Sequence, residues 1–288
     1  MARHARVRRN RRRQPPRPPR PSRLKELPFN RLIPNILTVL ALCAGFTAVR
    51  FAIEARWKEA VVAVALAAIL DTLDGAIARL LKAQSKFGAE LDSLADFVSF
   101  GVAPALILYF WTLQGAAGIG GWAVSLAYAV ACGLRLARFN TALARAEPPQ
   151  GMAPAANTFF QGVPAPAAAG LALLPLVGSF PLGDTVLRLT PVAGGFALAS
   201  ATLMVSTVPT FSLKGVRIRR ERVPLMLLVV GLIAAFLVSR PWVTLSLLGL
   251  GYIISLPLSV RAFHRLKRDA RAVRQQEETA PVDEAAKE

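Results

Sequence analysis

Eight apolar segments dominate this sequence, and each is about as long as a membrane-spanning helix. They lie at residues 34–54, 58–82, 87–112, 120–142, 160–180, 188–210, 223–239 and 241–260. About 20 apolar residues in a helix cross the ~30 Å hydrocarbon core of a bilayer, where backbone amides must be hydrogen-bonded within the chain. With 54% hydrophobic residues and a mean hydropathy of +0.44, the chain is predicted to be an all-α polytopic membrane protein.

Positive charge indicates which side faces the cytoplasm. The chain carries 35 Lys and Arg against 17 Asp and Glu, a net charge of +18. The basic residues cluster in the first 31 residues, at 214–222 and at 261–274. Basic loops stay in the cytoplasm, where they meet anionic headgroups, so both termini are predicted to be cytoplasmic. The Arg/Pro-rich tail at 1–26 is predicted to be disordered, and because no aromatic residue interleaves its arginines, nucleic acid is not an expected partner.

Four aspartates interrupt two neighbouring apolar segments. Asp71 and Asp74 stand three residues apart near the end of one segment, and Asp92 and Asp96 stand four apart near the start of the next. Each pair therefore projects from one face of its helix. In an antiparallel hairpin the two pairs lie at similar depth, near the cytoplasmic surface. Carboxylates inside a membrane cost roughly 2.5–3.5 kcal/mol each on insertion scales, so the sequence predicts a compensating cation.

The residue types favour a hard, oxygen-ligated metal. Four carboxylates without nearby histidines or thiolates suit Mg²⁺, Mn²⁺ or Ca²⁺. The two cysteines, Cys43 and Cys132, lie in separate apolar segments and are interpreted as packing residues. Bound metals would neutralise a diphosphate substrate and activate a hydroxyl nucleophile.

Small and basic residues accompany the carboxylates. Gly75 and Gly88 would let a ligand approach the backbone, and Arg79 would pair with a phosphate or anchor its helix at the interface. A competing hypothesis is an ion-coupled transporter, in which buried carboxylates bind protons or sodium. Such carboxylates usually come from several helices near the midplane, whereas here one hairpin supplies all four.

The aspartate motif resembles the signature of the CDP-alcohol phosphotransferase family. Its eight fixed positions span 26 residues: Asp71-x-x-Asp74-Gly75-x-x-Ala78-Arg79 and, after eight residues, Gly88-x-x-x-Asp92-x-x-x-Asp96. The resemblance implies a membrane enzyme with a six-helix core, usually a homodimer, that transfers a phosphatidyl or similar group from a CDP-linked donor to an alcohol. It also implies that the four aspartates hold two divalent ions, Mg²⁺ or Mn²⁺, and that Asp96 takes the proton from the attacking hydroxyl. The CDP part is expected at Asp74, Gly75, Ala78, Arg79 and Gly88.

Further stretches resemble the phosphatidylserine synthase branch of that family. They lie at 34–38, 91–104, 135–140 and 162–169. This resemblance implies CDP-diacylglycerol and L-serine as substrates. Glycerol 3-phosphate, inositol phosphate and choline remain alternative acceptors, although a phosphorylated acceptor would want a more basic pocket.

Polar residues outside the signature are candidates for binding the two substrates. Arg135 and Arg138, one turn apart near the cytoplasmic end of the fourth segment, would hold the serine carboxylate; the alternative is that they only anchor the helix in headgroups. Asn35 and Thr38 would hydrogen-bond the CDP donor or merely pack helices together.

The expected organisation has five parts. A disordered tail (1–26) precedes a six-helix catalytic core (27–210), which opens with a short interfacial lead-in. A basic loop (211–222), two additional membrane helices (223–260) and a basic, then acidic tail (261–288) follow. The expected location is a bacterial-type cytoplasmic membrane.

Overall fold

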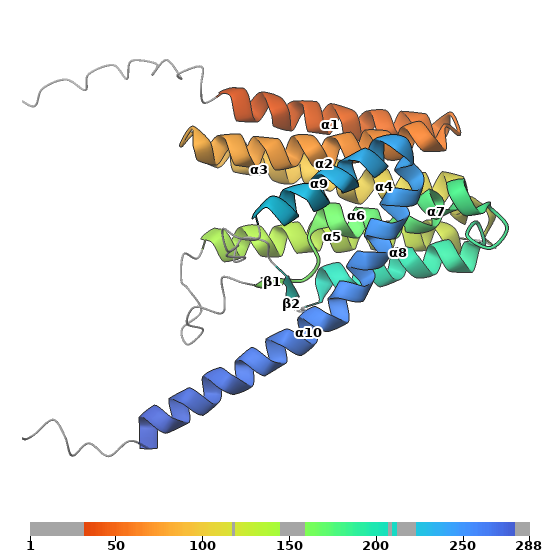
Figure 1. The fold of residues 1–288 in the computed structure, drawn as a ribbon. Helices are drawn as coiled ribbons and strands as arrows, with labels where there is room; N and C mark the ends of the chain where they lie inside the picture. Colours follow the sequence, from red (N-terminus) through yellow and green to blue (C-terminus); the bar gives the residue numbers. More distant parts are fainter. Residues whose placement is uncertain (1–31, 117–118, 145–158, 207–208, 212–222, 280–288) are drawn as a thin grey trace, which may run out of the picture.

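The computed structural model describes residues 32–116, 119–144, 159–206, 209–211 and 223–279. Within these ranges the chain is helical apart from one pair of three-residue strands (Figure 1). The elements are α1 (Leu32–Ile53), α2 (Trp57–Leu80), α3 (Lys86–Asp96), the π-helix η2 (Phe97–Val102), α4 (Ala103–Trp111), the 3₁₀-helix η3 (Leu113–Gly115), α5 (Gly120–Ala144), β1 (Phe159–Gln161), α6 (Ala165–Ala172), α7 (Leu174–Leu182), α8 (Thr190–Val205), β2 (Pro209–Phe211), α9 (Val223–Ser239) and α10 (Pro241–Thr279). The tail at 1–26 and most of the basic loop lie outside the described residues.

Each predicted apolar segment contains helix, so the all-α prediction is confirmed. Among the described residues, five helical stretches are long and apolar enough to cross a membrane, and the bent pair α6–α7 makes a sixth if it is one span. Helices α8 and α9 have 16 and 17 residues, which is about 24–26 Å and shorter than the ~30 Å hydrocarbon core. Eight complete spans therefore remain a prediction.

The segments predicted at 160–180 and 188–210 are not uninterrupted helices. The first begins as strand β1, which pairs antiparallel with β2 at the end of the second, so that Phe159 lies opposite Phe211. Gly162, with φ +79°, turns the chain from β1 toward α6. Helices α6 and α7 then meet at an angle of 42°. Pro175 explains the break, because it has no N–H for the carbonyl four residues earlier and its ring crowds that carbonyl.

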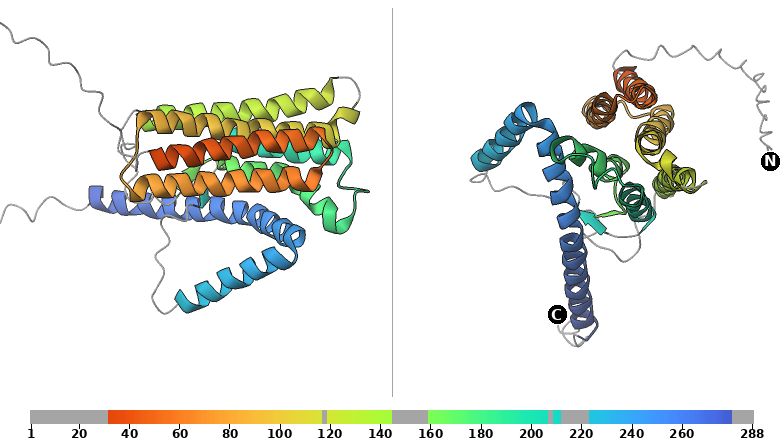
Figure 2. Two further views of the ribbon diagram at one scale, coloured as in Figure 1. Left: turned by 90° about the horizontal axis from the view of Figure 1, so that it is seen from above. Right: turned by 90° about the vertical axis from the view of Figure 1, so that its right-hand side faces the viewer.

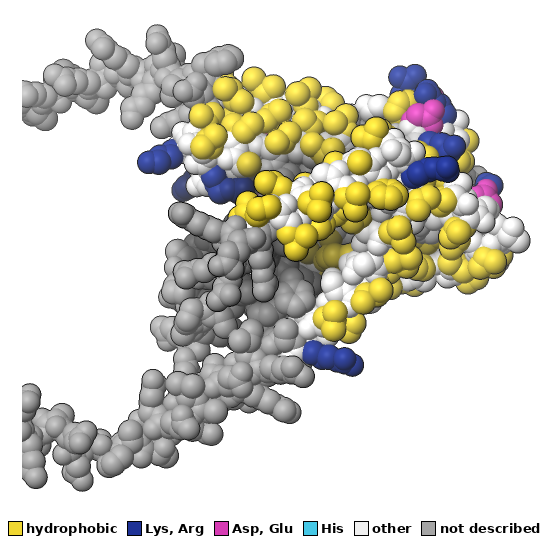
Figure 3. All heavy atoms as spheres, viewed as in Figure 1, with side chains coloured by type: hydrophobic (Ala, Val, Ile, Leu, Met, Phe, Trp, Pro, Cys, Tyr) yellow, Lys and Arg dark blue, Asp and Glu magenta, His cyan; other side chains and the backbone are white. Residues whose placement is uncertain are grey.

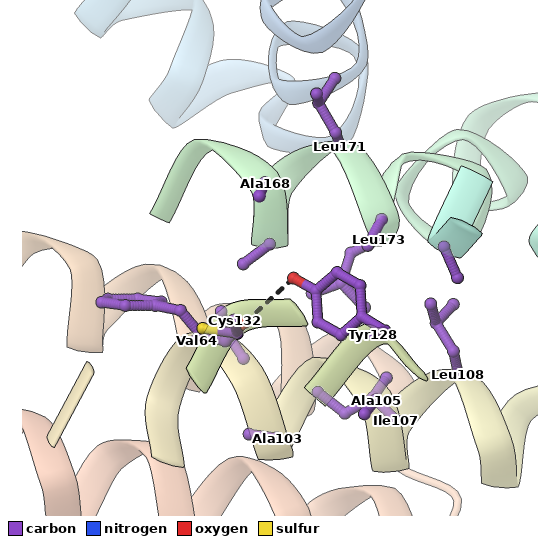
Figure 4. Packing of buried hydrophobic residues seen from close by; sticks show 14 of the residues in the cluster. Val64, Ala103, Ala105, Ile107, Leu108, Tyr128, Cys132, Ala168, Leu171 and Leu173 are labelled. Atoms are coloured by element: carbon purple, nitrogen blue, oxygen red, sulfur yellow. Dashed lines mark hydrogen bonds between the residues drawn. The ribbon is translucent and has the colours of Figure 1, made fainter. Parts of the chain in front are cut away.

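A π-helical turn directly follows Asp96. Pro104 cannot donate a hydrogen bond to the carbonyl of Phe100, which a regular helix would require. The Tyr128 hydroxyl of α5 donates to that carbonyl instead, at 2.9 Å. Tyr128 is fully buried, and Figure 4 shows its ring beside Leu108 and Leu173. The proline and the tyrosine together stabilise an irregular turn at one end of the carboxylate cluster.

Small residues let the first helices approach closely. α1 packs along α2 and also contacts α3, η2 and α4. A Cβ on Gly45 would lie 2.8 Å from the Cα of Ser99, and the Ser99 hydroxyl donates to the carbonyl of Ala41 at 3.2 Å. Close approach through small residues is typical of helix packing in membranes. Hydrophobic side chains cover the middle of the bundle, and Lys and Arg gather toward its two ends (Figure 3).

The last two helices leave the bundle at different angles. Helix α9 ends at Ser239, and α10 begins at Pro241, so a single residue separates the two helices, as the predicted segments 223–239 and 241–260 imply. Helix α10 contacts α6, α7 and β2, whereas α9 has no buried residue and diverges from the bundle (Figures 1 and 2). Helix α10 continues without interruption to Thr279, so the basic part of the predicted tail at 261–288 begins as an extension of the last helix.

Candidate metal centre

Two helices joined by one short turn supply the four aspartates. Asp71 and Asp74 lie in the second half of α2, and Asp92 and Asp96 lie in the second half of α3. Because α1 packs against both helices, it fixes how they face each other. The helical spacing seen in the sequence then directs each pair toward the space between α2 and α3.

The carboxylates converge as predicted. One oxygen from each of Asp71, Asp74 and Asp92 lies within 4.8 Å of the other two. The Asp74 side chain is buried, with 4% of its surface exposed, and the other two are half-buried. Asp96 lies beside Asp71, close enough for their side chains to share a hydrogen bond. The fourth carboxylate thus borders the group of three.

This donor set fits a hard divalent cation. Oxygens that coordinate Mg²⁺ at 2.0–2.1 Å lie ~3–4 Å from one another, so small side-chain rotations would close the group around an ion. In the described part of the chain, every salt bridge involves another acid: Glu54, Glu59 or Asp184. Buried like charges repel strongly in a low dielectric, and no salt bridge to Lys or Arg offsets that repulsion at the cluster.

Thr38 positions one of the ligands. Its hydroxyl lies 2.5 Å from Oδ2 of Asp74 and 3.0 Å from the carbonyl of Pro34, and it can donate its proton to one of them at a time. The Thr38 side chain is only 4% exposed. Residues that hydrogen-bond a metal ligand fix its orientation, so this placement favours a supporting role over direct contact with the donor.

The two glycines of the signature face side chains of the protein. A Cβ on Gly88 would lie 2.8 Å from Oδ1 of Asn35, so in this structure the Asn35 amide occupies the space beside Gly88, and the approach of a ligand there stays a prediction. The Gly88 amide donates to the Ser85 hydroxyl at 2.9 Å, which caps α3. At Gly75 the nearest group to a Cβ would be the exposed Arg79 guanidinium, at 3.5 Å. Ala78, between Gly75 and Arg79 in the sequence, is half-buried.

The two arginines of α5 have different surroundings. Arg135 is half-buried, lies near enough to Asp96 to interact with it electrostatically, and has a buried Nε without a hydrogen-bond partner. Arg138 is exposed, and its Nη1 donates to the carbonyl of Val205, the last residue of α8, at 3.1 Å. A guanidinium at a helix C-terminus also interacts favourably with the helix dipole. The structure therefore brings Arg135 to the cluster and leaves Arg138 at the end of another helix.

One polar residue at this site has no place in the sequence-based prediction. Tyr252 of α10 interacts electrostatically with Arg135, although the two are far apart in the sequence. Its only signal in the sequence is a hydroxyl group within an apolar segment, and a tyrosine in such a segment usually serves as an interfacial anchor.

The comparison with known proteins indicates the same family as the aspartate motif. Residues 31–210 match the family model of the CDP-alcohol phosphatidyltransferases, and residues 221–257 match a second model, CDP-alcohol phosphatidyltransferase 2. A Mycobacterium bovis protein named CDP-diacylglycerol--serine O-phosphatidyltransferase is 39% identical over 233 residues, covering 81% of this chain and 79% of that protein.

Proteins with the same name from other organisms are also similar. The Mycobacterium leprae protein is 36% identical over 231 residues, which cover 80% of this chain and 75% of that protein. A Helicobacter pylori protein is 40% identical over 150 residues, which cover 51% of this chain and 59% of that protein. The first family model covers more than half of the chain and includes all four aspartates, and a transferase family leaves no support for the ion-coupled transporter. The chain is therefore a multi-pass membrane enzyme of the CDP-alcohol phosphatidyltransferase family.

Proposed function

We propose that this enzyme makes phosphatidylserine and CMP from CDP-diacylglycerol and L-serine. The observation that carries the proposal is the convergence of Asp71, Asp74 and Asp92 with Asp96 beside them. The chain is also 39% identical, over 81% of its length, to a protein named for this reaction. The serine oxygen attacks the phosphorus that bears diacylglycerol. The bond from that phosphorus to the oxygen of CMP breaks, and CMP leaves.

The four aspartates would perform two tasks, which are metal binding and proton removal. Asp71, Asp74 and Asp92 would hold one divalent ion, and Asp96 together with Asp71 would help to hold a second, with Mg²⁺ or Mn²⁺ as the expected occupants of an all-oxygen site. Bound ions supply charge neutralisation for the diphosphate and a site for the hydroxyl nucleophile. Asp96 takes the serine hydroxyl proton, because it stands at the edge of the group, toward Arg135.

The remaining site residues would bind and orient the two substrates. Arg135 is the better candidate for the serine carboxylate, because its buried Nε has no partner while Arg138 is engaged at the end of α8. For the CDP donor, Arg79 beside Gly75 offers a guanidinium to the phosphates, and Asn35 offers its amide from the Gly88 side. These placements support the donor region predicted around Ala78.

The membrane arrangement follows from the same proposal. The end of the bundle where α2 leads into α3 faces the cytoplasm, so that L-serine enters from there and CDP-diacylglycerol enters from the bilayer. Both termini are cytoplasmic, the membrane is a bacterial-type inner membrane with anionic lipids, and the enzyme is a homodimer. The core at 27–210 carries the reaction, and the helices at 223–260 are attached to it.

The acceptor is tested by CMP release from the purified enzyme in detergent micelles with CDP-diacylglycerol and Mg²⁺ or Mn²⁺. Serine is compared with glycerol 3-phosphate, inositol phosphate and choline, and EDTA removes the metal. We expect CMP release that depends on metal and on serine. Release with a different alcohol alone would refute the choice of serine, and release unaffected by EDTA would refute the metal centre.

The role of Asp96 has its own test. Asp96→Asn keeps the size of the side chain and removes the base, so turnover should fall at least ~10²-fold while the protein stays folded. Glu90→Gln on the same helix is the matched control, because Glu90 is exposed and outside the cluster. Activity of Asp96→Asn within a few-fold of wild type would contradict the assignment.

A further inference from the structure

Two buried polar atoms without hydrogen-bond partners lie near each other at the proposed acceptor site. In the described part of the chain, three buried side-chain atoms lack a partner: Ser125 Oγ, Arg135 Nε and Tyr252 Oη. Arg135 and Tyr252 interact electrostatically with each other, and Arg135 also interacts with Asp96. Buried donors without partners are rare in native proteins. Two that interact with each other, one of them on the arginine that also interacts with Asp96, indicate a place where a ligand supplies the missing acceptors.

Tyr252 reaches this place because α10 packs against the catalytic bundle. Trp242, Leu245, Tyr252, Ile253 and Leu256 are the half-buried residues of α10 that pack on the hydrophobic core. Trp242 stacks edge-on against Phe180 of α7 at 4.5 Å, which holds the start of α10 in place. Tyr252 lies on the same packed side about three turns later. The last helix is therefore more than an attachment to the core, since it brings a phenol near Arg135, which in turn interacts with Asp96.

We propose that the Tyr252 hydroxyl determines acceptor specificity, by donating a hydrogen bond to the carboxylate of the acceptor alcohol while Arg135 binds the same carboxylate. The inference rests on the proposed function. The chemistry is complementary, because the phenol and the guanidinium are donors and a carboxylate offers two acceptor oxygens. The acceptor hydroxyl then lies toward Asp96. An amino alcohol without a carboxylate leaves both donors unpaired, and sites built to hydrogen-bond a group strongly reject analogues that lack it.

The test is Tyr252→Phe, which keeps the ring and removes only the hydroxyl. We expect the KM for serine to rise at least ~10-fold, with the KM for CDP-diacylglycerol and kcat within twofold of wild type. The preference for serine over ethanolamine, which differs from serine only by the carboxylate, should fall by a similar factor. CMP release in the absence of any alcohol, where water replaces the acceptor, should stay unchanged and shows that the donor site is intact.

Tyr109→Phe is the matched control. Tyr109 lies in α4 and makes ring contacts with Phe110 and Trp122, at 5.5 and 5.3 Å, away from the aspartates. The same substitution there should leave every kinetic constant unchanged.

Three outcomes would overturn the inference. One is an unchanged KM for serine in Tyr252→Phe. Another is a parallel change in kcat and both KM values with a lowered melting temperature, which would mean a packing role. The third applies if the wild-type enzyme uses an alcohol other than serine, a result that refutes the proposed function by itself. In that case an unchanged KM for that alcohol in Tyr252→Phe would also refute the role of Tyr252 in acceptor specificity, whereas a raised KM would support it.

Discussion

Replacing Asp92 with Asn should stabilise the enzyme without metal and destabilise it, relative to wild type, with metal. The carboxylate oxygens of Asp71, Asp74 and Asp92 lie within 4.8 Å of one another, so each charged pair repels by about 3.5 kcal/mol at an effective dielectric constant of 20. Asp92→Asn removes two of the three repulsions. It also removes one ligand from the ion.

The size of both effects can be bounded. Solvent and protons bound to the cluster reduce the repulsion, so we expect a net gain of about 2 kcal/mol without metal, or roughly 4–8 °C in melting temperature. For wild type, Mg²⁺ at about 1,000 times its Kd adds about 4.1 kcal/mol, or roughly 8–16 °C. The variant should gain less than about 1.4 kcal/mol from the same Mg²⁺, because losing a direct ligand weakens the affinity by at least ~100-fold and RT ln(1 + [Mg²⁺]/Kd) falls accordingly.

The assay is the melting midpoint in detergent micelles, first with EDTA and then with increasing Mg²⁺. Glu90→Gln makes the same change of charge on α3 outside the cluster, and its curves should follow those of wild type. The expected signature is a crossing: Asp92→Asn melts above wild type in EDTA and below it in saturating Mg²⁺. Equal Mg²⁺ shifts in both proteins, together with a lower melting point of the variant in EDTA, would refute a metal centre at these carboxylates.

Two further substitutions test the supports of the site. Thr38→Val removes the hydroxyl that orients a ligand, so the Mg²⁺ concentration for half-maximal activity should rise ~10–100-fold; Thr47→Val, on the outer face of the same helix, should leave it unchanged. Gly45→Ala should lower the melting temperature because its Cβ would collide with the backbone of Ser99, whereas Gly195→Ala, which meets nothing within 4 Å, should raise it slightly. A neutral Gly45→Ala would contradict the close packing of α1 against η2.

The carboxylate cluster was predictable because its determinants are local. Helical spacing places Asp71 with Asp74 and Asp92 with Asp96, and a short turn between two apolar segments leaves little choice but an antiparallel pair. The all-α fold was predictable for a similar reason, since each apolar segment carries its own signal.

Contacts between distant segments were not predictable in the same way. The hydrogen bond from Thr38 to Asp74, the fit of Asn35 against Gly88, and the packing of Tyr252 near Arg135 depend on how separate helices are arranged. No periodicity in the sequence records that arrangement.

The effects of the prolines on the helices could be predicted only in part from the sequence. Pro175 and Pro104 break or distort helices through missing N–H groups, but whether the outcome is a bend or a π-helical turn depends on neighbours such as Tyr128. The strands β1 and β2 pair across more than 40 residues of chain, and three-residue strands carry too short a pattern to compete with the apolar signal around them.

The most direct test of the account counts both products of one reaction. The purified wild-type enzyme is given CDP-diacylglycerol, labelled L-serine and Mg²⁺ or Mn²⁺, and CMP and labelled phosphatidylserine are measured over time, with EDTA in a parallel sample. The account predicts equal amounts of both products and neither product in EDTA. Phosphatidylserine formed at the same rate in EDTA, or CMP formed without phosphatidylserine in the presence of metal, would contradict it.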